Sequence, residues 1–211
     1  MSISDLATHW NSAYREKGED GVSWFQDAPD VSLELIAEIA SPKDSLIDIG
    51  GGASRLVDAL LAVGVPTLAV LDISQKSIDL TRARIGPLSN QVEWIVSDVT
   101  QWQPSRSYDV WHDRAAFHFL TDPADRKAYV EKMKWTVTSG GHTIMATFAS
   151  DGPERCSGLP VARYDPKSLA ETIGPSFELI MSRRHIHTTP WGAAQAFQFS
   201  VLRKIQRVGP R

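Results

Sequence analysis

Residues 45–56 read SLIDIGGGASRL, where an apolar run ends in an acid and leads through three glycines into a helix-like stretch. Glycine lets the backbone turn sharply and lets a ligand approach with no Cβ in the way. The helix after such a turn points its free N–H groups at whatever occupies the turn. The pattern predicts a strand–turn–helix unit that binds a nucleotide-like ligand, with Gly50 and Gly52 as the contact glycines.

The spacing of this motif separates two kinds of nucleotide ligand. A nicotinamide dinucleotide site would follow Gly-x-Gly-x-x-Gly, but counting from Gly50 places Arg55 at the third glycine position. The spacing fits acid-x-Gly-x-Gly-x-small instead, formed by Asp48, Gly50, Gly52 and Ser54. This departure disfavours a dehydrogenase.

Two further acids follow the next two apolar runs. Asp72 ends TLAVLD, and one carboxylate at such a place can accept hydrogen bonds from both hydroxyls of a ribose. Asp98 ends VEWIVSD in the same way. Each acid taken by itself has a simpler interpretation, which is that it only caps the following helix. The combination of three acids with the glycines favours a binding site.

Strands and helices alternate through the middle of the chain, after helix-like stretches at 5–16 and from Pro29 onward. Such an order predicts a parallel sheet covered by helices on both faces. Two final strand-like runs are joined only by TPWGA, too short for a crossover helix, so we expect an antiparallel pair at the sheet edge. The expected strands are 46–49, 67–73, 92–98, 108–113, 140–149, 177–188 and 194–204, and the expected helices 54–63, 74–85, 122–137 and 167–173.

The stretch DIGGGAS resembles the first motif of class I S-adenosylmethionine-dependent methyltransferases, with Ser54 where many members carry a third glycine. The resemblance implies a Rossmann-like, doubly wound α/β fold with five parallel strands and a C-terminal antiparallel hairpin, in the order 3-2-1-4-5-7-6. It also implies S-adenosyl-L-methionine as cofactor, with Asp48 at its methionine end and Asp98 near its adenine amino group. The expected cofactor-binding residues are Asp48, Gly50, Gly51, Gly52, Asp72, Ile73, Asp98, Val99, Tyr14 and Trp24.

Candidates for the acceptor side cluster in WHDRAAFHFL at 111–120, directly after the fourth expected strand. We expect His118 and Asp113 to be catalytic, since histidine is the natural base near neutral pH. A base is needed only if the acceptor must lose a proton, so a catalytic side chain is not required by the reaction. The simpler interpretation is that His112 packs inside and that Asp113 and Arg114 form a structural ion pair.

The segment HWNSAYREKGEDGVSWFQ at 9–26 is rich in aromatic residues. Trp10, Tyr14, Trp24 and Phe25 could form a lid that shields the reaction from water, or could simply fasten this segment to the body of the protein. The segment also resembles the start of lysine methyltransferases that act on elongation factor 1A and citrate synthase. The acceptor is therefore left open between a small molecule and a protein side chain, with a non-catalytic cofactor-binding protein as the rival class.

Two later segments offer weaker candidates. The loop 151–166 carries Arg155, Cys156, Arg163 and Tyr164, and its cysteine is expected to be a small buried residue rather than a nucleophile. His185 and His187 alternate on one expected strand without other obvious ligands, so no metal site is expected.

Length and charge bound these expectations. The 211 residues suit one domain, which we divide into a helical lid segment (1–40), a cofactor-binding core (41–150) and an acceptor-side loop with the final hairpin (151–211). The net charge of −3 disfavours a nucleic-acid partner. A single cysteine, no signal-peptide pattern and no apolar stretch of about 20 residues predict a cytoplasmic protein without membrane contact. The oligomeric state is left open.

Overall fold

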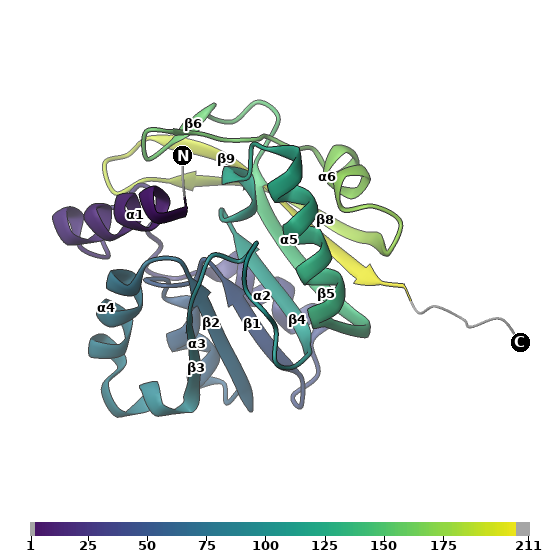
Figure 1. The fold of residues 1–211 in the computed structure, drawn as a ribbon, viewed down its shortest axis with the longest axis horizontal. Helices are drawn as coiled ribbons and strands as arrows, with labels where there is room; N and C mark the ends of the chain where they lie inside the picture. Colours follow the sequence, from purple (N-terminus) through teal and green to yellow (C-terminus); the bar gives the residue numbers. More distant parts are fainter. Residues whose placement is uncertain (1–2, 206–211) are drawn as a thin grey trace, which may run out of the picture.

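The computed structural model describes residues 3–205 and is built around one seven-stranded sheet (Figure 1). The strand order is β3-β2-β1-β4-β5-β9-β8, with parallel pairing from β3 to β5 and antiparallel pairing of β9 with both neighbours. This confirms the predicted topology. The strands of the sheet are β1 (Ser45–Ile49), β2 (Thr67–Asp72), β3 (Val92–Val96), β4 (Tyr108–Arg114), β5 (Val137–Phe148), β8 (Phe177–Thr188) and β9 (Ala194–Lys204).

Helices cover both faces of this sheet, as predicted. One face packs on α2 and α3, and the other packs on α5 and α6, so each face has its own apolar core. Among residues 3–205, none of the helices combines the length and apolarity that a membrane span needs. The helices are α1 (Ile3–Lys17), α2 (Asp30–Ile39), α3 (Leu56–Ala62), α4 (Gln75–Ile85), α5 (Pro123–Thr136) and α6 (Pro166–Ile173), with 3-10 helices η1 (Gly86–Gln91) and η2 (Phe117–Phe119).

Strand β1 lies at the centre of the sheet, and all five of its residues are buried. Its register places Asp48 beside Val70 of β2 and beside His112 of β4. A polar side chain on a fully buried strand must find partners, because a buried charge without compensation is costly. The position of Asp48 therefore points to a function at this end of the sheet.

Side-chain caps begin the helices where the sequence predicted them. The Ser74 hydroxyl accepts a hydrogen bond from the Ser77 amide and starts α4. The Asp122 carboxylate accepts from the Ala124 amide and starts α5, with Pro123 in the first turn. These caps fix where each helix leaves the sheet.

Strand β5 begins earlier than predicted. It starts at Val137, directly after α5, whereas the pattern GGHTIMATFA placed its start at 140. The two glycines lie inside the strand, where the pairing with β4 shifts register between Tyr108 and Val110. Gly140 has φ of 80°, and a Cβ on Gly141 would lie 2.7 Å from the Asp109 carbonyl oxygen. The glycines therefore form an irregularity within the strand rather than its boundary.

The loop 151–166 contains a small hairpin that the sequence analysis missed. Strands β6 (Arg155–Cys156) and β7 (Leu159–Pro160) pair antiparallel across Ser157 and Gly158, which both have positive φ. A two-residue turn of this kind is a hairpin signal, and the Ser-Gly pair was present in the sequence. The hairpin carries Cys156 to the carboxyl ends of the strands.

Candidate active site

The glycine turn lies where the structure leaves no room for side chains. Gly50 has φ of 70°, and a Cβ there would lie 2.8 Å from the Ala116 Cβ. A Cβ on Gly51 would collide with the Asp48 carboxylate, and one on Gly52 would lie 2.6 Å from Asp72 Oδ2. The absence of side chains thus brings the backbone close to both acids.

Asp72 fixes the far side of this turn. Its Oδ2 accepts the Gly52 amide at 3.0 Å, and its Oδ1 accepts the Ser74 amide at 2.7 Å. Burial raises the pKa of this carboxyl to about 6, while the two amides lower it. A carboxylate offers about four acceptor positions, so Asp72 retains capacity for further donors such as hydroxyls.

A pocket opens at the carboxyl ends of the parallel strands, and we refer to it as the central pocket. Its walls come from α1, from the segment after α1, from the ends of β1 to β4, and from the β6–β7 hairpin. Seven of the ten predicted cofactor-binding residues line it, namely Tyr14, Trp24, Gly50, Asp72, Ile73, Asp98 and Val99.

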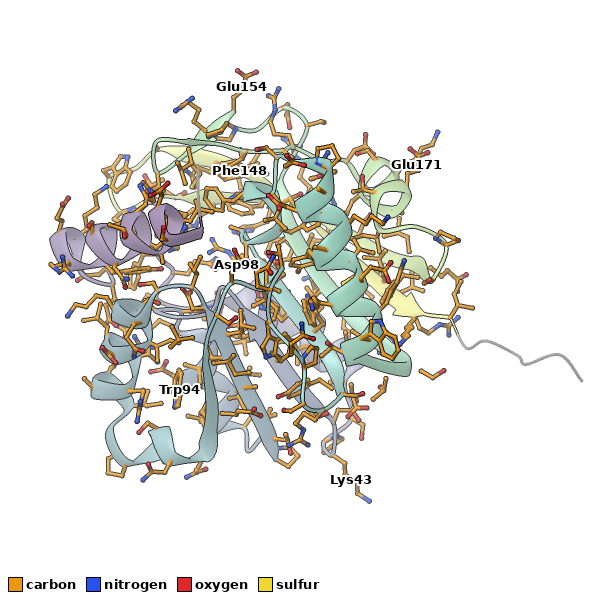
Figure 2. The ribbon with its side chains drawn as sticks, viewed as in Figure 1. Lys43, Trp94, Asp98, Phe148, Glu154 and Glu171 are labelled. Carbon is orange, nitrogen blue, oxygen red and sulfur yellow. The ribbon has the colours of Figure 1, made fainter. Side chains whose placement is uncertain are left out.

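Asp98 lies just beyond the end of β3, in the pocket wall. Figure 2 shows it near the upper ends of the strands, in the region between α1 and α5 in that view. Its Oδ1 accepts the Thr100 amide and the Thr100 hydroxyl, both at 2.7 Å. The strand ends two residues earlier than predicted, and the turn that follows holds this side chain in place.

A second, smaller pocket adjoins the glycine turn and is called here the glycine-turn pocket. Asp48, Gly51 and His112 line it, together with residues shared with the central pocket. Asp48 is 2% exposed, and its Oδ1 contacts His112 Nδ1 at 2.7 Å. The other ring nitrogen, Nε2, lies 2.9 Å from the Ser32 hydroxyl. His112 is thus buried as the simpler interpretation expected, and it orients Asp48.

The second oxygen of Asp48, Oδ2, is buried and has no hydrogen-bond partner among the described residues. A buried carboxylate oxygen left this way is unfavourable unless a ligand supplies a donor. This orphaned acceptor, together with the glycine turn beside it, fits a ligand that carries an ammonium group and a ribose.

The two residues expected to be catalytic lie outside the wall of the central pocket. Asp113 is fully buried and accepts from the Ala116 and Phe117 amides and from the Tyr129 hydroxyl. Burial raises the pKa of its carboxyl to about 6, and the hydrogen bonds from Tyr129, Ala116 and Phe117 oppose this. The expected ion pair of Asp113 with Arg114 is wrong, because Arg114 donates to the Trp24 carbonyl instead.

His118 is also fully buried, between the rings of Phe119 and Phe148. Its Nδ1 lies 3.4 Å from the Phe148 amide, and its Nε2 has no partner among the described residues. Burial, reinforced by the charge of Arg114, lowers its pKa to about 3. A histidine in this state is neutral and weakly basic.

Three of the four aromatic residues expected to form the lid lie in the central pocket. The Trp24 indole donates to the Tyr14 hydroxyl at 3.1 Å, and the Trp10 ring meets Trp24 edge to face. Phe119 of η2, just beyond the end of β4, packs against Trp10 at 4.9 Å between ring centroids. Trp10, Tyr14, Trp24 and Phe119 are called here the aromatic wall. Phe25 faces the glycine-turn pocket instead.

Helix α1 is fastened to the start of α4 by one asparagine that was not singled out from the sequence. Asn11 Oδ1 accepts from the Ser74 hydroxyl at 2.9 Å and from the Lys76 amide at 3.0 Å. The same Ser74 caps α4, so the lid helix and the helix after Asp72 share one anchoring point.

The remaining candidates have structural surroundings. His187 Nε2 contacts the Ser23 carbonyl, and within residues 3–205 no group of three or more potential ligands is placed to hold a metal. Cys156 is 5% exposed, and burial raises the pKa of its thiol to about 11. Arg163 contacts the Gly152 carbonyl and Glu154. The buried cysteine matches the expectation, although its side of the hairpin lines the central pocket.

The sequence analysis did not foresee how β4 ends. Ala115 has φ of 73°, uncommon for a residue with a side chain, and its amide donates to the Ala146 carbonyl. Ala115 and Ala116 both line the central pocket. Backbone conformations of this kind gather at functional sites, but a sequence offers no signal for them at alanine.

The segment that carries the core of this site is similar to known proteins. Residues 46–141 match the family described as "Methyltransferase domain". The chain is 24% identical over 123 residues to nodulation protein S of Rhizobium tropici, covering 58% of this chain and 51% of that protein. It is 25% identical over 118 residues to the mouse eEF1A lysine and N-terminal methyltransferase, covering 55% of this chain and 17% of that protein. The chain therefore spans about half the length of nodulation protein S and less than a fifth of the mouse protein.

Solved structures extend the likeness to the whole fold. A crystal structure of Burkholderia thailandensis 1,6-didemethyltoxoflavin-N1-methyltransferase superposes with a TM-score of 0.73 at 19% identity. The match covers 98% of this chain and 92% of that one. The shared fold includes the N-terminal segment and the final hairpin.

Proposed function

We propose that this protein, which resembles class I S-adenosylmethionine-dependent methyltransferases in its matched domain and in its fold, transfers a methyl group to a small-molecule acceptor. The observation that carries the proposal is the glycine turn held between two buried acids, Asp48 and Asp72, at the mouth of an apolar pocket. S-adenosylmethionine is the cofactor. When bound, it supplies a methyl group already activated by the sulfonium, so the protein has mainly to position the acceptor and exclude water.

The three acids have separate tasks in this proposal. Asp48 accepts from the ammonium group at the amino-acid end through its orphaned Oδ2. Asp72 accepts from the ribose hydroxyls, and the amides of Gly52 and Ser74 hold it in place. Asp98 lies at the adenine, with Val99 against the ring. Ile73, Tyr14 and Trp24 complete the enclosure.

The acceptor lies against the aromatic wall and the strained end of β4. This part of the central pocket is mainly apolar, with Leu6 and Leu120 beside the four aromatic residues. An apolar enclosure excludes water, and exclusion of water favours transfer to the acceptor over hydrolysis. We therefore place a small, mainly apolar acceptor here.

His118 and Asp113 enter this proposal as positioning residues. Both are fully buried; Asp113 accepts from the Ala116 and Phe117 amides of the turn that shapes the pocket wall, whereas His118 contacts the Phe148 amide at the end of β5. The transfer then relies on proximity, which by itself supplies a large part of a rate enhancement. Acceptors that attack without a base, such as neutral amines and thiolates, suit this arrangement.

A methyl-transfer assay tests the proposal. The purified protein is incubated with S-adenosylmethionine carrying a radiolabelled methyl group and with pools of small amines, thiols and carboxylic acids. We expect label in at least one small-molecule product, and we expect Asp48→Asn to reduce it at least tenfold, since an uncharged amide no longer attracts the ammonium. Asp79→Asn, an exposed acid on α4, is the matched control and should be unaffected.

A second candidate function is protein lysine methylation. Its support is the similarity to the mouse eEF1A methyltransferase and the aromatic wall, because aromatic faces attract alkylammonium groups. Label in lysine-rich proteins, with none in small molecules, would favour this candidate. A protein that binds the cofactor without transferring label to either class would be a non-catalytic binder.

Three further expectations remain proposals. We infer no nucleic-acid partner, on the net charge of −3, and a cytoplasmic location, on composition. We also propose that residues 1–40, 41–150 and 151–211 act as lid, cofactor core and acceptor side of one domain.

A further inference from the structure

Arg114 is a cation without a carboxylate partner in the wall of both pockets. It ends β4, and it lines the central pocket and the glycine-turn pocket alike. Its Nη1 donates to the Trp24 carbonyl at 2.9 Å, and its guanidinium lies over the Phe197 ring at 4.9 Å. No ion pair within residues 3–205 involves it.

One whole edge of this guanidinium is unused. Nε and Nη2 are shielded from solvent, and neither has a hydrogen-bond partner among the described residues. These two atoms lie along the same edge of the planar group, and their parallel N–H bonds match the two oxygens of a carboxylate. Buried donors left without acceptors are rare and ask for an explanation.

The surroundings confirm that the charge is poorly compensated. Burial lowers the pKa of the Arg114 guanidinium to about 10, although Cys156 and Asp48 oppose this. After burial itself, the charge of Arg114 is the next cause of the lowered pKa values of three nearby histidines, His118, His185 and His187. The field of Arg114 is therefore felt at these three histidines, although the acids Asp48, Asp72 and Asp98 also line the two pockets.

The other basic residues near the glycine turn differ in this respect. Arg55 and Arg84 both pair with Glu19, and Arg84 pairs also with Asp58. Their charges are already balanced, so they do not compete with Arg114 as a site for an anion.

We propose that Arg114 binds a carboxylate through its Nε–Nη2 edge, and that this carboxylate belongs to the amino-acid end of the cofactor. The glycine-turn pocket holds the orphaned acceptor Asp48 Oδ2 and the orphaned donors of Arg114 together, which is the pairing that the ammonium and carboxylate of an α-amino acid require. The assignment deepens the proposed function and rests on it. The acceptor molecule is the other possible source of a carboxylate, because Arg114 also lines the central pocket.

Calorimetric titrations with two adenosine thioethers related to the cofactor separate these possibilities. S-adenosylhomocysteine carries the amino-acid end, whereas 5′-methylthioadenosine lacks it and keeps the adenosine. We expect Arg114→Met to weaken S-adenosylhomocysteine about 10- to 100-fold, the range for a lost charge-assisted bidentate contact, and to change 5′-methylthioadenosine less than about threefold. Arg114→Lys keeps the positive charge but loses the two parallel N–H donors, so its affinity for S-adenosylhomocysteine should lie between those of the wild type and Arg114→Met.

Retained binding of 5′-methylthioadenosine shows that the Arg114→Met protein is folded. Replacing an uncompensated buried charge with an apolar side chain should leave the melting temperature of the ligand-free protein unchanged or higher. Arg203→Met is the matched control. Arg203 is an exposed arginine of β9 that pairs with Glu178 of β8, and this variant should bind both ligands as the wild type does.

The second arm tests the acceptor as the source. Benzoate and hexanoate, with benzamide and hexanamide as uncharged controls, are titrated into the protein saturated with S-adenosylhomocysteine. The wild type could bind the two acids more tightly than the amides, and Arg114→Met could lose that preference while still binding S-adenosylhomocysteine as tightly, relative to 5′-methylthioadenosine, as the wild type does. This result would assign the carboxylate to the acceptor and overturn the cofactor assignment. If Arg114→Met alters neither preference, Arg114 is no carboxylate site. If the wild type binds neither nucleoside, it is the proposed function that fails.

Discussion

The two sides of the central pocket are built in different ways. The cofactor side uses backbone amides and acids from consecutive strand ends, so that Gly52, Asp72 and Ser74 contact one another within one strand–turn–helix neighbourhood. The acceptor side uses side chains from segments far apart in the chain, such as Trp10 of α1 against Phe119 of η2. The geometry of the cofactor side is therefore set by the backbone, whereas that of the acceptor side depends on individual side chains and their tertiary contacts.

The largest expected effect is on the acceptor side, at the buried support under its wall. Asp113→Ala removes the acceptor for the Tyr129 hydroxyl and for the Ala116 and Phe117 amides. We expect the free energy of unfolding to fall by about 3 kcal/mol, because three buried donors lose their partner. Urea denaturation measures the change.

Tyr129→Phe removes only one of these contacts and should cost about 1 kcal/mol. Below the melting transition, S-adenosylhomocysteine should bind both variants nearly as it binds the wild type. A specific loss of cofactor affinity would contradict the separation of the central pocket into a cofactor side and an acceptor side.

The next effect is on the cofactor side, at the glycine turn. Gly50→Ala places a Cβ 2.8 Å from the Ala116 Cβ at φ of 70°, so we expect a loss of about 1–3 kcal/mol and at least tenfold weaker cofactor binding. Gly64→Ala has a similar φ of 78° with nothing within 4 Å, and it isolates the cost of the backbone conformation. Equal effects of the two variants on affinity would contradict a close approach of the cofactor at Gly50.

The pH dependence of cofactor binding tests whether the ionised Asp72 carboxylate accepts from the cofactor. Its pKa is raised to about 6 in the ligand-free protein, and only the ionised carboxylate can accept from two hydroxyls. Affinity should therefore be constant above pH 7 and fall about tenfold by pH 5, as protons compete for the carboxylate. Titrations of Asp72→Asn should give weaker binding with a flat profile in this range.

The contribution of Asp72 to folding stability depends on pH in the opposite direction to its contribution to cofactor affinity. Because the pKa of Asp72 is higher in the folded protein than its ordinary value of 3.8, this group favours folding most below pH 4. That contribution is lost as the pH rises through 6. Asp113 behaves in the same way, since burial also raises its pKa to about 6.

The smallest effect is expected at the lid. Tyr14→Phe removes the acceptor of the Trp24 indole N–H while keeping the ring in the pocket. We expect about 1 kcal/mol of lost stability and a two- to fivefold change in cofactor affinity, measured by thermal unfolding and calorimetry. A change above twentyfold would mean that the Tyr14 hydroxyl contacts the cofactor directly.

The glycine turn and the elements around it were predictable from the sequence because their signals are local. The turn formed by Asp48, Gly50 and Gly52 and the start of the helix expected over 74–85 each depend on a few neighbouring residues, and each is found where it was expected. Buried, continuous strands predicted a parallel sheet for the same reason, whereas the strand order came from the resemblance to class I methyltransferases. The boundary of β5 was wrong because Gly140 and Gly141 can serve equally inside a strand or before it.

The acceptor side was less predictable because its contacts are tertiary. His118 follows a strand end, but the positive φ of Ala115 and the packing of Phe148 enclose it. The Asp113–Arg114 ion pair failed because neighbouring residues on a strand point to opposite faces. The unused edge of Arg114 has no signal in the sequence, since it depends on where Trp24 and Asp48 lie.

Calorimetric titration of the wild-type protein with S-adenosylhomocysteine, alongside NAD, tests the central claim most directly. We expect one site per chain with micromolar affinity for S-adenosylhomocysteine, and no measurable heat with NAD. Binding of NAD, or of neither ligand, would contradict it and would leave the glycine turn between Asp48 and Asp72 without the ligand assigned to it.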